Sequence, residues 1–209
     1  MSEKVILAIE SAIAGGSVSL IDGENEIASW SGSSDVSKAE ELLVNIDALL
    51  TTNGVARGDI GLVAASAGPG SFTGIRIGLA TALGLKNGLN ISMASESALK
   101  AMASMQNDVE EITAAVPMGR NSVCLQSFSR RDNALIAINE PHTVPEDRFA
   151  ELVTARDKRF LVHGILAASS DGAPGLVDFG SNIAFAIGCL CRTASKTVAE
   201  PLFVSKSFV

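Results

Sequence analysis

The segment whose residues could most readily bind a ligand is the glycine-rich run from Gly68 to Gly78, Gly-Pro-Gly-Ser-Phe-Thr-Gly-Ile-Arg-Ile-Gly. It lies between an apolar run at 61–66, predicted to be a buried strand, and a segment with helical spacing at 75–85. Open α/β folds place ligand loops at such junctions, where free backbone N–H groups can bind an anion. The spacing nevertheless fits neither a P-loop, which needs Gly-Lys-Ser/Thr, nor a dinucleotide loop, because the third glycine, Gly74, comes one residue late.

The sequence contains few residues that could bind a metal ion. The two histidines, His142 and His163, are too far apart in the sequence for a helical motif such as HxxxH. The three cysteines, Cys124, Cys189 and Cys191, show no CxxC spacing, which argues against zinc and disulfides and is typical of a reducing cytoplasm. No apolar run is long enough to span a bilayer, and no signal peptide is recognisable. We therefore predict no metal site, a cytoplasmic location and no membrane association.

The overall charge excludes one further class of function. The chain has 209 residues, with 16 Lys and Arg against 23 Asp and Glu, for a net charge of −7. An acidic surface repels phosphates, so independent binding of nucleic acid through a broad basic face is disfavoured. There is no tyrosine and one tryptophan, so no aromatic platform for single strands is expected. Hydrophobic residues make up 47% of the chain, as in a globular protein.

The elements that must position the glycine-rich run follow a repeated order. In the first half we predict strands at 5–9, 17–21, 26–30, 61–66 and 90–93, a helix after a capping box of Ser37 and Glu40, a helix at 75–85, and a helix from Ser95 to about 106. In the second half we predict strands at 112–116, 122–128, 134–138 and 160–163, a helix starting at Pro145, a loop at 168–175, a helix at 182–191 and a terminal strand at 201–204.

This duplicated strand–strand–strand–helix–strand–helix order indicates the fold class. We predict an α/β protein with the two-lobed ribonuclease-H-like, actin-like (ASKHA) fold and a shortened second lobe. The N-terminal lobe is expected at 1–106 and the smaller, divergent C-terminal lobe at 107–209.

The predicted helix after the loop carries small residues at helical spacing. Gly74, Gly78 and Thr81 or Ala82 follow one another at this spacing, and Gly84 with Gly88 extends the pattern. Each glycine inside a helix costs about 1 kcal/mol relative to alanine, so a close backbone neighbour is expected. That neighbour is either the protein's own sheet or a helix of another chain. Arg76 lies near the helix N-terminus, where a cation is unfavourable, so it should pair with a carboxylate of its own chain or of a partner.

The run from Gly68 to Leu85 resembles the signature of the TsaB (YeaZ) family, and the start of the chain, Ile6 to Ala12 followed by Ser17 to Leu20, resembles that family's first hairpin. The resemblance covers residues 4 to about 105. It implies a bacterial protein of tRNA threonylcarbamoyladenosine biosynthesis that has no catalytic residue. It further implies a subunit that dimerises when alone, binds the catalytic subunit TsaD, works with the ATPase subunit TsaE, and meets tRNA only through the complex.

In that family the glycine-rich helix belongs to a helical surface used for self-association and for pairing with TsaD. Transferred to this sequence, the resemblance favours a partner for the close neighbour of the small residues and for the carboxylate of Arg76. The interface residues that it implies are Gly68, Pro69, Gly70, Ser71, Phe72, Thr73, Gly74, Arg76, Gly78, Thr81, Ala82 and Leu85.

The sequence departs from the family pattern where nucleotide chemistry would occur. Glu10-Ser11-Ala12 stands where relatives have Asp-Thr-Ser, Lys38-Ala39-Glu40 where they often have His-Ser-Glu, and Pro117 to Arg120 where they have a turn resembling Asp-Ala-Arg. We therefore expect a degenerate nucleotide site at Glu10 and Ser11 and no cofactor of the chain's own. ATP or ADP is expected, if anywhere, at the interface shared with the catalytic subunit.

The alternative is an enzyme of the same fold acting on its own. A small-molecule kinase would use Glu10 as its metal carboxylate and the glycine loops to hold phosphates. A glycoprotease-like metallopeptidase would need paired histidine ligands, which the two distant histidines do not supply. The missing hydroxyl and carboxylate groups beside Glu10 also weaken the kinase, so the sequence favours the non-catalytic subunit.

Overall fold

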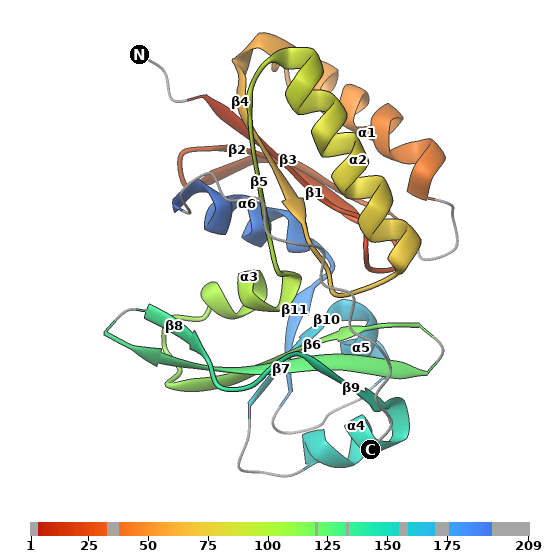
Figure 1. Ribbon diagram of the computed structural model, residues 1–209, viewed down its shortest axis with the longest axis vertical. Coiled ribbons are helices and arrows are strands. Elements are labelled where there is room, and N and C mark those ends of the chain that lie inside the picture. Colours follow the sequence, from red (N-terminus) through yellow and green to blue (C-terminus); the bar gives the residue numbers. More distant parts are fainter. Residues whose placement is uncertain are drawn as a thin grey trace.

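The computed structural model describes residues 4–32, 38–119, 121–132, 134–154, 159–169 and 176–193. They form two β-sheets with helices on their outer faces and a helical layer between them (Figure 1). This arrangement confirms the predicted two-lobed, actin-like α/β fold. None of the described helices is both long and apolar enough to cross a membrane.

The first sheet contains five strands in the order β3-β2-β1-β4-β5. Its strands are β1 (Val5–Glu10), β2 (Ser17–Asp22), β3 (Asn25–Ser31), β4 (Ile60–Ser66) and β5 (Ser92–Glu96). Strand β1 is antiparallel to β2 and parallel to β4. All six residues of β1 are buried, as expected for a strand with helices on both faces.

Different parts of the chain cover the two faces of this sheet. On the outer face lie α1 (Lys38–Thr52) and α2 (Phe72–Leu89), which follow it closely in sequence; the short 3₁₀ turn η1 (Arg57–Asp59) precedes β4. On the inner face lies α6 (Ile183–Thr193), which comes from the C-terminal half of the chain (Figure 1). The core of the first sheet is therefore completed by a helix that is synthesised last among the described elements.

The second sheet has the order β11-β10-β6-β7-β8, with β9 pairing to another part of β7. Its strands are β6 (Glu111–Pro117), β7 (Ser122–Arg131), β8 (Ala134–Ala137), β9 (His142–Pro145), β10 (Phe160–His163) and β11 (Leu176–Gly180). Helix α3 (Ala98–Ser104) packs on the face toward the first sheet, and α4 (Glu146–Thr154) and α5 (Gly164–Ser169) pack on the other. The alternation along β6 explains this division, because Ala114 and Val116 face α3 whereas Ala115 faces α4 and α5.

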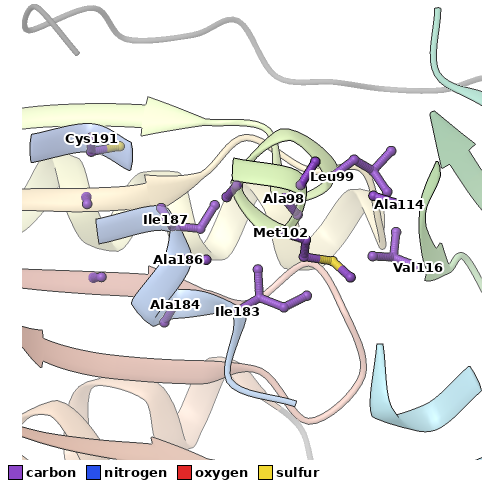
Figure 2. Packing of buried hydrophobic residues seen from close by; sticks show 14 of the residues in the cluster. Ala98, Leu99, Met102, Ala114, Val116, Ile183, Ala184, Ala186, Ile187 and Cys191 are labelled. Carbon is purple, nitrogen blue, oxygen red and sulfur yellow. The ribbon is translucent and has the colours of Figure 1, made fainter. Parts of the chain in front are cut away.

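One hydrophobic core joins the two sheets through α3 and α6. Figure 2 shows Leu99 and Met102 of α3 beside Ile183 and Ile187 of α6, and the cluster extends to Val116 of the second sheet. At Gly188 the contact with the first sheet is so close that a Cβ atom would overlap the side chain of Ile21. The space between the lobes is thus filled by packed side chains along the length of these helices.

Polar contacts fix the position of α6 at both ends. At its start, the N–H of Ala184 donates to Ser17 Oγ at 3.0 Å, and Asn182 Nδ2 donates to Glu26 Oε1 at 2.7 Å. At its other end, Arg192 lies 3.2 Å from a carboxylate oxygen of Glu24. The three contacts connect α6 to the β2–β3 hairpin, which is distant in sequence but adjacent in the fold.

Most predicted elements are confirmed, with two corrections at helix starts. Ser95 does not cap α3, because it lies within β5; Ser97 is the cap and accepts the N–H of Lys100 at 3.4 Å. Pro145 ends β9, and the helix begins one residue later. Strands β9 and β11 and helix α5 were not predicted. The predicted capping box at Ser37 and the terminal strand at 201–204 lie outside the described residues. The lobe boundary at residue 106 stays a prediction.

The buried thiols allow a test of this core. Burial raises the pKa of Cys124 and of Cys191 to about 12, so at pH 8 on the order of 10⁻⁴ of each is the reactive thiolate. We expect neither to react with a thiol reagent such as DTNB in the folded protein at pH 8, and both to react on unfolding. If Cys191, which lies in the layer between the sheets, reacted as rapidly in the folded protein as in the unfolded one, this layer would have to open.

Candidate functional site

The glycine-rich segment lies directly against the loop that follows β1. The N–H of Ser71 donates to the carbonyl oxygen of Ala12 at 2.7 Å. In return, Ser11 Oγ donates to the carbonyl oxygen of Gly74 at 2.8 Å. Ser71 also caps α2, since its Oγ accepts the N–H of Gly74 at 3.3 Å. One backbone–backbone bond and one bond from the Ser11 side chain therefore hold the start of α2 against the first loop.

This close approach explains why glycine occupies three of the positions. A Cβ atom would overlap the carbonyl oxygen of Ala12 at Gly70, that of Ser11 at Gly74, and the hydroxyl of Ser11 at Gly78. The neighbour that the small residues accommodate is thus the chain's own first loop. Gly74, Gly78 and the equally buried Ala82 are covered by their own chain, and the partner interface expected from the resemblance stays a prediction.

The other members of the predicted interface set divide by exposure. Gly68 and Pro69 are buried, Gly70, Thr81 and Leu85 are half-buried, and Ser71, Phe72, Thr73 and Arg76 are exposed. The Arg76 guanidinium lies over the ring of Phe72, with its carbon 3.6 Å from the ring centroid. Within the described part of the chain Arg76 forms no ion pair, so its predicted carboxylate does not come from these residues. A partner's carboxylate at Arg76 stays a prediction.

Glu10, the last residue of β1, has its side chain inside the protein. The residue is 1% exposed, and Oε1 accepts the N–H groups of Ala12 and Ile13 at 2.5 and 2.9 Å. Ser11 beside it is 3% exposed and bound to Gly74 as described above. The structure thus brings the two predicted nucleotide-site residues together with the glycine-rich segment, but both are committed to contacts within the chain.

A cavity of about 410 Å³ opens between the first loop and the second sheet. Its described lining comes from the first loop, the start of α2, the β6–β7 turn and α5, and consists of Ala12, Ala14, Ser71, Pro117, Met118, Gly119, Asn121, Ser122, Glu146, Ile165 and Leu166. Two of the three segments that depart from the family pattern therefore contribute to this cleft, the first through Ala12 and the second through Pro117, Met118 and Gly119. Among these lining residues Glu146 is the only charged one, which does not suit a polyphosphate.

A second hollow lies on the outer face of the first sheet, between α1 and α2. This α1–α2 groove has a volume of about 350 Å³ and is lined by Leu7, Leu43, Ile46, Asp47, Leu50, Arg57, Ile60, Gly84, Leu85, Gly88 and Leu89. Nothing lies within 4 Å of the Cβ positions of Gly84 and Gly88. These two glycines, unlike Gly74 and Gly78, therefore have no close neighbour among the described residues.

Sequence reasoning did not identify most residues of this groove as a site. Of the predicted interface set only Leu85 lines it. The signal that could have found it is the width of the apolar stripe of α1: Leu42, Ile46 and Leu50 are buried, whereas Leu43 is 55% exposed and the adjacent Val44 is 66% exposed. An apolar stripe wider than one core-facing side indicates a second contact surface.

The two kinds of helical glycine make a direct test of which face is covered. We expect Gly74→Ala to lower the free energy of unfolding by about 1–3 kcal/mol, because the new methyl group meets the carbonyl of Ser11. We expect Gly84→Ala to raise it by about 0.5–1 kcal/mol through helix propensity alone, since the position is open. Urea unfolding followed by circular dichroism measures both. Stabilisation by both variants would mean that Gly74 is not packed against its own chain.

Comparison with known proteins agrees with this geometry. The family model described as "TsaD: tRNA N6-adenosine threonylcarbamoyltransferase" matches residues 35–154. The chain is 33% identical over 99 residues to the tRNA threonylcarbamoyladenosine biosynthesis protein TsaB of Escherichia coli, covering 46% of this chain and 43% of that protein. It is 35% identical over 98 residues to TsaB of Buchnera aphidicola, covering 45% and 44%. The matched region thus spans less than half the length of these curated relatives.

The fold extends the similarity beyond the matched region. The structure of YeaZ from Pseudomonas aeruginosa superposes with a TM-score of 0.70 at 19% identity, covering 96% of this chain and 100% of that one. At this identity the comparison supports the fold alone, and the fold is the one predicted. Together with the match over more than half of the sequence, it confirms the resemblance drawn from the glycine-rich run: the chain belongs to the tRNA N6-adenosine threonylcarbamoyltransferase (TsaD) family, and its named relatives there are TsaB proteins.

Proposed function

We propose that this chain is a non-catalytic subunit of the machinery that makes threonylcarbamoyladenosine in bacterial tRNA, and that it binds the catalytic subunit TsaD through the α1–α2 groove. The relatives named as tRNA threonylcarbamoyladenosine biosynthesis proteins support the pathway. The observation that carries the binding mode is the open apolar groove above Gly84 and Gly88.

The groove has the properties of a docking surface for a helix. Leu43 on α1 lines it and is 55% exposed, and the same two helices carry the exposed apolar side chains of Val44 and Leu83. Exposed apolar groups beside an open groove are typical of protein–protein contacts. The two glycines lower the floor of the groove, so that a partner helix can approach the backbone of α2 closely.

Charged groups stand at the margin of the groove. Arg57 and Asp47 line it and form an exposed ion pair at 2.6 Å. Such a pair contributes little to stability in water, about 0–1 kcal/mol, but it can set the orientation of a partner. An apolar centre with a charged margin is the usual anatomy of an interface between subunits.

The same proposal accounts for the net charge of −7. An acidic chain repels the phosphates of tRNA, so contact with the RNA would fall to the catalytic subunit and this chain would reach tRNA only through the complex. In the absence of TsaD, the exposed groove would be covered by a second copy of the chain. The ATPase subunit TsaE and any ATP or ADP would join at the assembled complex.

The contacts of the described residues do not favour the alternative of an independent enzyme. A kinase would require the Glu10 carboxylate to face a metal and a phosphate, whereas it is buried against its own backbone. Within the described residues no three histidine, cysteine or carboxylate side chains gather into a metal site of the kind that a peptidase needs. The subunit role is the one for which the molecule offers a surface.

Leucine placed in the groove should separate binding from folding. We expect Gly84→Leu and Gly88→Leu to leave the thermal unfolding temperature within a few degrees of wild type, because both positions are open. Each should weaken binding to TsaD from the same organism by at least about tenfold, equivalent to about 1.4 kcal/mol, since the side chain fills the space of the partner helix. Co-elution in size-exclusion chromatography and titration calorimetry measure this.

The matched control adds the same side chain at a distant exposed position. Ala137→Leu on β8, in the second sheet, should bind TsaD as the wild type does. Failure of the wild-type chain to co-elute with TsaD, with or without nucleotide, would overturn the proposed role. Unchanged affinity in both groove variants would instead overturn the proposed surface.

A further inference from the structure

We propose that the carboxylate of Glu10 is an internal anion that occupies the anion-binding turn after β1. In this position it takes the place that a phosphate group of a nucleotide would need, so the cleft of this chain does not hold a nucleotide. Removing the carboxylate should uncover a site for a small inorganic or organic anion. This inference concerns the cleft and does not rest on the proposed binding of TsaD.

The first step of the argument is the geometry of the turn. The N–H groups of two consecutive residues, Ala12 and Ile13, converge on the same oxygen of Glu10, at 2.5 and 2.9 Å. Successive backbone N–H groups that point at one spot form a concave site for a negative charge. The turn is closed by a further hydrogen bond, from the N–H of Gly16 to the carbonyl oxygen of Ile13 at 3.2 Å.

The second step is that this turn is held in place from both sides. Its carbonyl at Ala12 accepts the N–H of Ser71, and Ser11 Oγ donates to the carbonyl of Gly74. Gly70 and Gly74 lie so close to the turn that a Cβ atom at either position would overlap it. The N–H groups of the turn are therefore held in an orientation that suits an anion.

The third step compares how the Glu10 carboxylate and a nucleotide phosphate could each reach the turn. Glu10 is 1% exposed and extends from a central strand with β2 on one side and β4 on the other. Ala12 and Ala14 from the same turn line the cleft between the sheets. A nucleotide in that cleft would thus bring its phosphates to a turn whose N–H groups are already bonded to a carboxylate, and like charges would repel.

The remaining lining of the cleft does not compensate for that repulsion. Polyphosphates are usually held by arginine or lysine side chains, by free N–H groups or by a divalent cation on exposed carboxylates. The described lining residues include no arginine or lysine, and the charged one, Glu146, is negative. The described lining residues therefore do not fit ATP or ADP, although the fold belongs to a nucleotide-binding class.

The test compares two variants of Glu10. Glu10→Ala removes the carboxylate and leaves both N–H groups without their acceptor, whereas Glu10→Gln keeps an oxygen that can accept them. We expect Glu10→Ala to unfold several degrees below the wild type and to recover most of that difference in the presence of formate, which matches the missing carboxylate. Chloride at the same ionic strength should not restore it. The unfolding temperatures of the wild type and of Glu10→Gln should not respond to formate beyond the chloride control.

A second measurement uses the wild-type chain and does not depend on how the variants fold. Calorimetric titration of inorganic phosphate, and of ADP with Mg²⁺, should show no saturable heat. Saturable binding of either to the wild type would overturn the proposal. So would a Glu10→Ala protein that formate stabilises no more than chloride, or one that stays unfolded in formate while Glu10→Gln folds. Co-elution of Glu10→Gln with TsaD should be normal, so failure here is distinguishable from failure of the groove.

Discussion

The contact between the first loop and the start of α2 is the constraint from which the rest of the molecule follows. Two backbone segments, one after β1 and one after β4, approach each other closely, because glycine occupies the positions where they touch. A reciprocal pair of hydrogen bonds, through Ser71 and Ser11, fixes their separation. This contact sets the direction in which α2 leaves the sheet, and with it the place of the α1–α2 groove on a different side of the helix.

The same contact determines how the backbone N–H groups at this junction are used. In a protein that works by binding phosphate, a glycine-rich loop keeps its N–H groups free for the ligand. Here the N–H of Ser71 is bonded to the first loop, and the N–H groups of that loop are bonded to Glu10. Groups that could have faced a ligand instead stabilise the junction between strand and helix.

Sequence reasoning predicted the architecture well because local signals decided it. The continuous apolar residues of β1, the hairpin between β2 and β3 and the repeated element order are visible in the sequence and are confirmed. The errors arose where tertiary pairing overrides a local signal. Pro145 resembles the first residue of a helix, but it ends β9, which pairs only with β7 and so tolerates a residue without an N–H group. Ser95 resembles a cap, but it pairs with Ala65 in the sheet.

The site was predicted only in part, for a reason that is again physical. In the sequence, Gly78 and Gly84 belong to one pattern of small residues. In an α-helix, however, Gly84 lies about 120° around the axis from Gly78. One therefore meets the first loop and the other an open groove. Helical rotation could have separated the two faces. It could not have shown which of them the chain itself covers. The contacts of Glu10 could not be predicted from the sequence, since a carboxylate at the end of a strand can face either a ligand or its own backbone.

The path of α6 has a consequence for the biogenesis of the protein. This helix covers Ala8 and Ile21 on the inner face of the first sheet, although it ends at Thr193 and the strands that it covers end at residue 96. During translation the first five strands leave the ribosome with this face still uncovered, and they wait for roughly a hundred further residues before their core can close. The second sheet must be made in the interval. The α1–α2 groove is therefore supported by a finished sheet only after both lobes have been synthesised.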